Sequence, residues 1–381
     1  MAGFCQGGGV GKCIAEWIID GEPSIDVWAM DVARFGDYAS PQYGTIKSSE
    51  NYERRFIMTF PNETLPKGRK QKTTALYDRF VNQGAVMGDS FGLENVLWFA
   101  NNKEDAHEEP TIKRSRSHDY VSKEVINVRE NVGLIEVANF SKHEFKGPDA
   151  RKFLDHIMAG RLPKPGRISL SPMLSYRGKL CGDLTVACLD ENEFMVFGSG
   201  AAQEMHRRWF ESHLDKFNLN YKNRSDEFHG LSIAGPNSRK VLEKIVRDDV
   251  SNEKFKFRDS RRMFVGGVPA LVNRISFTGE LGYEIYVAPH YQLKLYEELV
   301  EAGKEFNIKP FGGRALMSMR LEKNWGAWTL DYRPDFTAKE TGLDAFINWD
   351  KEFIGKESAQ KEDRKSTRLN SSHQIISYAV F

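Results

Sequence analysis

Two segments of the chain are almost alike, and this likeness constrains the fold more than any other feature. Residues 145–157 (FKGPDARKFLDHI) and residues 233–245 (IAGPNSRKVLEKI) are 88 residues apart. Each contains Gly-Pro, then a short polar residue suited to a helix N-cap, then apolar residues at helical spacing. The repetition predicts two similar halves.

The same offset, 88 or 89 residues, relates the elements that follow each segment. Residues 186–199 and residues 275–288 each alternate as a β-hairpin. An amphipathic helix follows each hairpin, at 202–217 and at 291–306. The repeated unit is therefore strand, helix, hairpin and helix. Two such units predict an α+β fold with antiparallel sheets, and ligands often bind between paired halves.

The segments before the repeat are less regular. Residues 52–60 alternate like a strand, and residues 74–82 have the pattern of a short helix. Residues 101–118 are polar and charged without periodicity, which predicts a linker or exposed loop.

Close to its start the chain has a glycine-rich stretch, Gly7-Gly8-Gly9-Val10-Gly11-Lys12, followed by a helical pattern. A glycine turn at a helix N-terminus can bind an anion, because free amides and the positive end of the helix dipole face the ligand. A tight loop that caps a helix explains the same letters equally well. No strand precedes the stretch, as it would in a complete dinucleotide-binding fold.

Composition excludes several classes of function. The 54 basic residues balance 53 acidic ones, so nothing favours nucleic acid or an anionic membrane as a partner. No apolar stretch approaches the roughly 18 residues that cross a bilayer. The four cysteines form no CxxC pair, and the nine histidines form no HxxxH or HExxH pair. We therefore expect no metal site and a reducing, cytoplasmic location.

Residues 363–381 (DRKSTRLNSSHQIISYAVF) differ abruptly in composition from what precedes them. The string is similar to a translated adapter of the kind ligated to DNA for short-read sequencing. We expect it to be an artefactual tail that contributes nothing to the fold. We also expect the chain to be an internal piece of a longer protein.

Several motifs in a fixed order carry a family resemblance. GPDARKFLDHI, GKLCGDLTV, FTGELGYEIYV and RLEKNWGAW resemble the folate-binding fold of aminomethyltransferases, the glycine-cleavage T-proteins. The run YERRF…GRKQKT…LYDRF…GAVMG…WFA, within residues 52–100, is similar to dimethylglycine and sarcosine dehydrogenases, which join that fold to an FAD-dependent amine oxidase.

This resemblance divides the chain into domains and implies a reaction. Residues 1–41 would be the C-terminal remnant of an FAD-dependent oxidoreductase domain, residues 42–100 its central or linker domain, and residues 101–362 the folate-binding domain. The implied substrate is a small N-methyl amine such as dimethylglycine or sarcosine. FAD would oxidise it, and tetrahydrofolate would take the one-carbon unit. Four glycines would approach the flavin closely: Gly7, Gly8, Gly9 and Gly11.

The resemblance also implies which residues bind folate. In GKLCGDL only one acid remains, because Gly182 stands where relatives have the first, so Asp183 is the expected catalytic base. In FTGELGYE the last acid, Glu284, would pair with the N–H donors of the pterin. Phe277 replaces the usual tyrosine and would stack, from the opposite arm of the hairpin. Both acids could instead be ordinary solvated strand residues, and Arg314 is not assigned a role.

Two alternative functions remain open. The first is a flavin-free, tetrahydrofolate-dependent aminomethyl or methyl transferase, which the glycine-rich stretch and residues 52–100 count against. The second is a non-catalytic folate-binding protein. Proteins of that kind carry a KGC[FY]xG[QE] motif, which the chain lacks.

Overall fold

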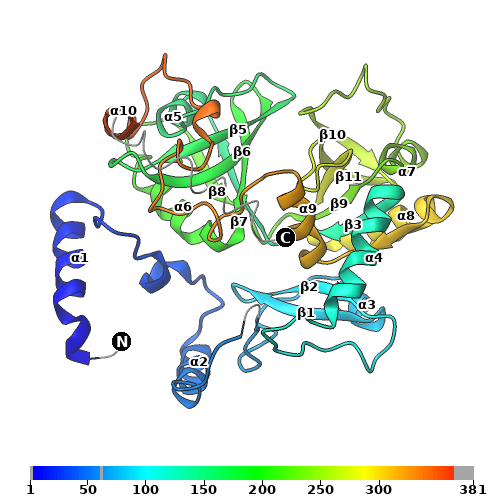
Figure 1. Cartoon of the computed structure of the whole chain (residues 1–381). Helices are drawn as coiled ribbons and strands as arrows, with labels where there is room; N and C mark the ends of the chain where they lie inside the picture. The colour runs from blue at the N-terminus through cyan, green and yellow to red at the C-terminus, as the bar shows by residue number, and fades with distance from the viewer. Residues whose placement is uncertain (1–2, 61–62, 364–381) are drawn as a thin grey trace.

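The computed structural model describes residues 3–60 and 63–363 of the chain. Two large sheets, each covered by helices, lie side by side, and a smaller N-terminal part lies below them in the view of Figure 1. The expected tail lies outside the described residues except for Asp363, which ends helix α10 (Lys356–Asp363).

The first half of the repeat is built as strand, helix, three-stranded meander and helix. Its sheet has the order β5-β6-β7-β4-β8, with all pairs antiparallel. The sequence predicted this unit but missed its first meander strand, β5. The elements are β4 (Phe140–Lys146), α5 (Ala150–Ile157), β5 (Arg167–Leu174), β6 (Leu180–Asp190), β7 (Glu193–Ser199) and α6 (Gln203–Glu211).

The second half repeats this arrangement strand for strand. Its sheet has the order β10-β11-β12-β9-β3-β13, in which only the β3–β13 pair is parallel. The elements are β9 (His229–Ala234), α7 (Ser238–Ile245), β10 (Ser260–Val265), β11 (Val268–Asn273), β12 (Gly282–Val287) and α8 (Gln292–Gly303), with β13 at Ile308–Pro310. The predicted α+β architecture with two similar units is confirmed.

The strand before each half pairs with the sheet of the other half. β3 (Val132–Glu136) precedes the first half but pairs with β9 of the second. β8 (Asn220–Asn223) precedes the second half but pairs with β4 of the first. This exchange interlocks the halves, because each sheet includes a strand that is adjacent in sequence to the other half.

The Gly-Pro segments take the same conformation in both halves. Gly147 has φ of +144° and Gly235 has φ of +131°, a region that residues with a Cβ rarely adopt. The amide of Gly147 donates to the carbonyl of Asn192 at 3.0 Å, and that of Gly235 donates to the carbonyl of Leu281 at 2.8 Å. The repeated glycine is therefore required by the backbone at the start of each repeated helix.

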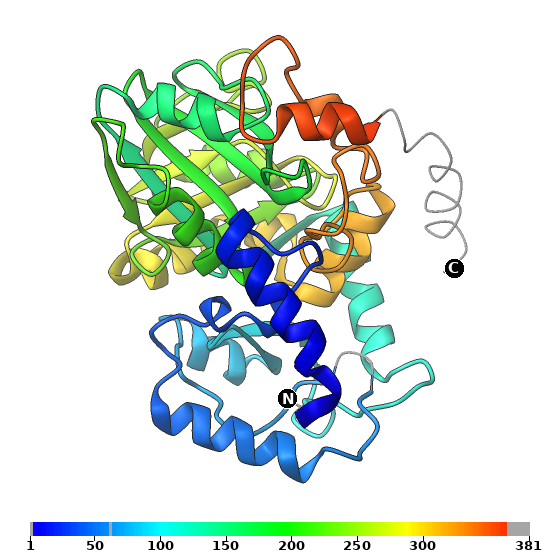
Figure 2. The ribbon, with the colours of Figure 1, turned by 90° about the vertical axis from the view of Figure 1, so that its left-hand side faces the viewer.

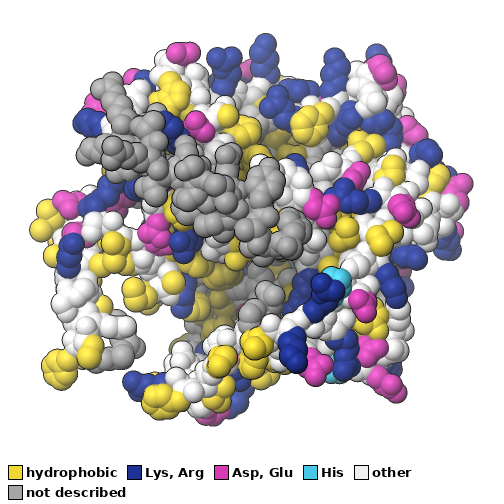
Figure 3. Space-filling model, in the orientation of Figure 1, with side chains coloured by type: hydrophobic (Ala, Val, Ile, Leu, Met, Phe, Trp, Pro, Cys, Tyr) yellow, Lys and Arg dark blue, Asp and Glu magenta, His cyan; other side chains and the backbone are white. Residues whose placement is uncertain are grey.

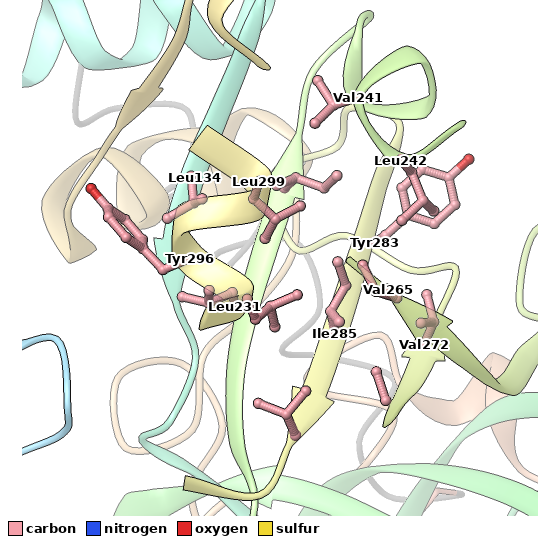
Figure 4. Packing of buried hydrophobic residues seen from close by; sticks show 14 of the residues in the cluster. Leu134, Leu231, Val241, Leu242, Val265, Val272, Tyr283, Ile285, Tyr296 and Leu299 are labelled. Carbon is pink, nitrogen blue, oxygen red and sulfur yellow. The ribbon is translucent and has the colours of Figure 1, made fainter. Parts of the chain in front are cut away.

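Helices α7 and α8 cover one face of the second sheet. Val241 and Leu242 of α7, with Leu295 and Leu299 of α8, pack on fully buried residues of the strands, among them Ile285 (Figure 4). The first half has its own core around Phe145, Phe153, Phe194 and Phe210. At about 25 cal/mol for each Å² of apolar surface removed from water, these two cores are the main stabilising contribution to the body.

A third cluster lies between the two sheets and joins the halves. We call it the central cluster. It combines Ala187 and Phe197 of the first sheet with Leu271 and Tyr286 of the second. Because successive strand side chains alternate between faces, this cluster identifies which residues of each strand face the other half.

The expected hairpin at 275–288 is partly wrong. Its second arm is β12, but its first arm is β11, and residues 274–281 form a loop. Side chains hold this loop out of the sheet. Arg274 donates to Asn252 Oδ1 at 2.6 Å, and the hydroxyls of Ser276 and Thr278 bond to each other at 2.7 Å. Such local polar bonds compete with strand pairing.

Two predictions for the N-terminal part are wrong. Residues 52–60 form no strand, because α2 (Pro41–Glu53) extends through Tyr52, and Ser40 caps its start by accepting from the Tyr43 amide. The side chains of Phe56 and Met58 are exposed. The glycine-rich stretch is no turn either, because α1 (Gly7–Asp20) begins at Gly7.

The other N-terminal expectations are confirmed. A short helix, α3 (Tyr77–Asn82), lies within the expected 74–82 and leads into the hairpin of β1 (Ala85–Ser90) and β2 (Leu93–Phe99). Residues 101–116 are irregular, and α4 (Ser117–Glu130) follows. α9 (Gly313–Glu322) lies centrally between the two sheets in Figure 1.

α1 lies apart from the body and has no buried residue (Figures 1 and 2). It is held by a few contacts at its C-terminal end. The Arg208 guanidinium lies 5.3 Å from the centre of the Trp17 ring, and Arg177 pairs with Asp20 at 3.4 Å. Among the helices of the described residues, none combines the length and apolar character that a membrane crossing requires.

Candidate functional site

Asp183 lies on β6, on the face of the first sheet that looks toward the second half. Leu184 and Val186 point into the core of the first half, whereas Ala187 belongs to the central cluster. The alternation of β6 places Asp183 on the same face as Ala187. Its side chain is half-buried, and burial raises the pKa of its carboxyl to about 7.

Glu284 lies on β12, on the face of the second sheet that looks toward the first half. Tyr283 and Ile285 point into the core of the second half, and Tyr286 into the central cluster. The Tyr286 hydroxyl donates to Oε2 of Glu284 at 2.9 Å. Burial raises the pKa of Glu284 to about 7, although this hydrogen bond and the charge of Lys323 favour its ionised form.

The two acids therefore face the same junction from opposite halves. They are the kind of groups that general acid–base chemistry uses, because each titrates near neutral pH. Their half-buried positions differ from those of solvated strand acids, and their roles toward folate stay a prediction.

A segment after α9 lies beside both acids. Lys323, just after the helix, acts on the carboxylate of Glu284 and donates from Nζ to the carbonyl of Ser276 at 2.9 Å. Tyr332 lies close enough to Asp183 to be affected by its charge, which adds to the effect of burial in raising the Tyr332 pKa to about 12. The first and last residues of the segment 323–332 thus each lie near one of the two acids. The segment overlaps the motif RLEKNWGAW.

Lys142 is a site residue that sequence reasoning missed. It lies fully buried on β4, and its Nζ donates to the carbonyl of Ala138 at 2.7 Å and lies 5.9 Å from the centre of the Tyr286 ring. Burial lowers the pKa of Lys142 to about 7, while the charges of Asp226, Glu136 and Glu284 oppose this shift. A lysine in the pattern FSKHEFK gives no local signal of burial.

Phe277 is positioned differently from the prediction. It lies in the loop 274–281, not on a hairpin arm, so it does not oppose Glu284 across a strand pair. It still packs against the central cluster and lines a cavity.

That cavity has a volume of about 1110 Å³. It lies between β2, the irregular residues 108–115, β3 and α9. Asp183 and Glu284 do not line it. Arg314 does, and it bonds to Glu108 at 2.7 Å and to the Ser117 hydroxyl at 2.6 Å.

The four glycines proposed for the flavin are exposed on α1. A Cβ added at Gly7, Gly8, Gly9 or Gly11 would meet no atom within 4 Å. They form no cradle within the described residues, and their contact with a flavin stays a prediction. Across residues 3–60 and 63–363, no group of three or more His, Cys, Asp or Glu side chains is arranged to hold a metal ion.

Comparison with known proteins gives two family matches. The GCVT N-terminal domain matches residues 76–351, and the FAD dependent oxidoreductase central domain matches residues 20–74. Among solved structures, glycine cleavage system aminomethyltransferase T from Bartonella henselae superimposes with a TM-score of 0.66 at 22% identity, covering 77% of this chain and 75% of that chain. This likeness shows the fold.

Curated relatives include two dehydrogenases. Human mitochondrial dimethylglycine dehydrogenase is 34% identical over 372 residues, which cover 96% of this chain and 43% of the relative. Mouse mitochondrial sarcosine dehydrogenase is 28% identical over 95% of this chain and 44% of its own length. The chain thus spans less than half the length of the dehydrogenases it matches. The resemblance stated from the motifs is confirmed: the chain belongs to the GCVT family, with an FAD dependent oxidoreductase central domain ahead of the GCVT domain and dimethylglycine and sarcosine dehydrogenases among its relatives.

Proposed function

We propose that this chain transfers a one-carbon unit to tetrahydrofolate as part of a flavoprotein that N-demethylates dimethylglycine, sarcosine or a similar amine. The observation that carries the proposal is the pair of half-buried carboxyls, Asp183 and Glu284. Each lies on the face of its sheet that looks toward the other half, and each has a pKa of about 7. The names of the relatives give the substrate class. FAD, when bound in the longer protein, would accept the hydride of the N-methyl group.

The roles of the two acids follow from their chemistry. A nitrogen of tetrahydrofolate attacks the methylene carbon of the iminium, and the C=N electron pair returns to the amine nitrogen. Asp183 takes the proton that the attacking nitrogen loses and returns it to the amine nitrogen, and the second folate nitrogen then displaces the amine. The proton that this second nitrogen loses also goes to the released amine. The products are methylenetetrahydrofolate and the protonated demethylated amine, so atoms and charge balance.

Glu284 is proposed to anchor the pterin. A carboxylate accepts from two adjacent N–H donors at once, which no neutral side chain does as well. The Tyr286 hydroxyl occupies one acceptor position of Oε2, so both oxygens of Glu284 keep acceptor capacity for the ligand. Phe277 is proposed to pack against the folate from the loop that Lys323 holds.

The remaining parts of the proposal concern domains, partners and location. We place the domain limits at residues 41, 100 and 362. Nucleic acid and membranes are not proposed as partners, since Lys and Arg lie interspersed with Asp and Glu on the face that Figure 3 shows. The four cysteines are free, which suits a reducing compartment such as the cytoplasm. The dehydrogenase relatives are named as mitochondrial proteins.

The match to an oxidoreductase central domain favours this function over a flavin-free transferase. The near-neutral pKa values of the two acids favour it over a non-catalytic folate-binding protein, which needs no acid–base groups.

The test is tetrahydrofolate binding by the 381-residue chain, measured by calorimetry under reducing, anaerobic conditions. Glu284→Gln replaces an acceptor with a donor that faces the pterin amine. It should weaken binding by about 1–3 kcal/mol, or roughly ten- to a hundredfold. Glu280→Gln is the control, because Glu280 belongs to the same motif but pairs with Arg129 at the surface, at 2.7 Å. Absence of binding by the parent chain, or equal losses in both variants, would contradict the proposal.

A further inference from the structure

The 1110 Å³ cavity contains one carboxylate whose charge no cation neutralises directly. Of the five glutamates in its lining, Glu63 pairs with Arg54, Glu94 with Arg69 at 2.7 Å, Glu108 with Arg314 at 2.7 Å and Glu109 with Arg116 at 3.3 Å. The fifth is Glu136, at the end of β3. Within the described part of the chain, no lysine, arginine or histidine forms an ion pair with it.

Neutral donors hold Glu136 in position. Gln292, fully buried at the start of α8, donates from Nε2 to Oε1 of Glu136. Since the Gln292 oxygen only accepts, His229 Nδ1 must donate to it, at 3.2 Å. The Thr74 hydroxyl is the second donor to Glu136. Two donors leave a carboxylate with unused acceptor capacity.

The lysines near Glu136 do not serve as an ion-pair partner for it. Lys142 is near enough to act on its charge, but its Nζ is bonded to the carbonyl of Ala138. Lys72, which acts on His229, forms its ion pair with Asp226 at 3.1 Å. Burial raises the pKa of Glu136 to about 7, as expected for a carboxylate that lacks a cation.

The rest of the cavity suits an organic cation. Five phenylalanines contribute to its lining: Phe80, Phe99, Phe140, Phe277 and Phe311. Carboxylate and aromatic faces together bind alkylated ammonium groups, whose charge is spread over methyl groups and is weakly hydrated. Lys113 and Arg114 also line the cavity and are exposed, where they could meet a carboxylate at the other end of a zwitterion.

We propose that this cavity is a binding site for a small N-methylated ammonium compound, with Glu136 as the residue that holds the cation. Neither Asp183 nor Glu284 lines the cavity, and Phe277 is the residue that adjoins both proposed sites. The inference rests on the proposed function only for the choice of an N-methyl amine as the cation.

The test is calorimetric titration of the 381-residue chain with N,N-dimethylglycine and, separately, with tetramethylammonium chloride at pH 7.5. We expect saturable binding of both, with tighter binding of dimethylglycine. Glu136→Gln should weaken both by at least tenfold. Glu136→Asp, which keeps the charge, should bind each compound with an affinity between that of the parent chain and that of Glu136→Gln. Glu280→Gln is the control, because Glu280 does not line the cavity and already has an arginine partner, and it should bind as the parent does.

A second readout does not rely on a variant. A bound cation lowers the pKa of the carboxyl beside it, so binding near pH 7 should release protons, measurable as a dependence of the binding heat on the ionisation enthalpy of the buffer. Absence of binding by the parent chain, or equal affinity in Glu136→Gln, would overturn the inference. Tetrahydrofolate binding is measured independently, so a chain that binds folate but no amine cation refutes this inference alone.

Discussion

The ring of Phe197, in the first half, stacks on the ring of Tyr286, in the second, with centroids 4.7 Å apart and planes 29° apart. The hydroxyl of the same tyrosine bonds to Glu284. Tyr286 therefore packs against the other half with its ring and positions the carboxylate of Glu284 with its hydroxyl.

Tyr286→Phe should separate these two roles. The stack on Phe197 remains, while the hydrogen bond to Glu284 is lost at a cost of about 1 kcal/mol in the free energy of unfolding. Because that bond favours the ionised carboxylate, the pKa of Glu284 should rise from its value of about 7. NMR titration of ¹³C-labelled glutamate measures it. Tyr221→Phe, which removes a hydroxyl bonded to His143 at 2.9 Å, should leave that titration unchanged.

Asp183→Asn should separate binding from transfer in a protein that includes the flavin-binding part. Tetrahydrofolate binding should stay close to that of the parent, while capture of the one-carbon unit slows by roughly 10²–10⁴ because the base is gone. Amine oxidation should continue, so formaldehyde should appear where methylenetetrahydrofolate formed before. The measurement is the partition between these two products in the presence of tetrahydrofolate. Methylenetetrahydrofolate formation at the parent rate would show that the base lies elsewhere.

The parts of the fold that the sequence predicted are those fixed by local signals. The Gly-Pro segments and the helices after them repeat because a glycine with positive φ is needed at Gly147 and Gly235. The exchange of β3 and β8 between the sheets was not predictable, because each strand pairs with residues 74 to 101 positions away. Pairing over such distances leaves no mark on local periodicity.

In the candidate site, too, the sequence predicted what local motifs determine and missed what depends on tertiary packing. Asp183 and Glu284 were found through motifs, and strand alternation then placed both on the inner faces. Lys142 and Glu136 were not found, because burial of a charged side chain depends on what packs over it. The loop around Phe277 was misjudged, since the alternation of residues 275–281 looks like a strand until the hydroxyl bonds of Ser276 and Thr278 are known.

The buried histidines predict how stability depends on pH. Burial lowers the pKa of His206 to about 4, whereas an unfolded histidine titrates near 6.5. Between these values the unfolded state binds more protons, so the stability that His206 contributes above pH 6.5 is lost as the pH falls toward 4. The slope reaches about 1.4 kcal/mol per pH unit for one histidine.

His206→Gln isolates this contribution from that of the buried carboxyls, whose raised pKa values act in the opposite sense. Glutamine keeps a donor toward the carbonyl of Cys181, which His206 Nε2 now reaches at 2.9 Å. Its side chain does not titrate. Urea unfolding at pH 5, 6 and 7 should show the variant less stable at pH 7 and the difference shrinking at lower pH. A difference that is constant across this range would mean that folding does not change the pKa of His206.

The repeated glycines give the most direct test of the duplicated architecture. A Cβ at Gly235 would lie 2.5 Å from the carbonyl oxygens of Val128 and Asn131, and a Cβ at Gly147 would lie 2.8 Å from the Cα of Leu219. Neither backbone contact can give way easily, and both φ values are unfavourable for alanine. Gly147→Ala and Gly235→Ala should each lower the free energy of unfolding by at least about 2 kcal/mol. The control is Gly9→Ala in α1, where the added Cβ meets nothing and helix propensity improves, so the melting temperature should stay the same or rise slightly. If either variant has the same free energy of unfolding as the control, the backbone at that position does not require glycine.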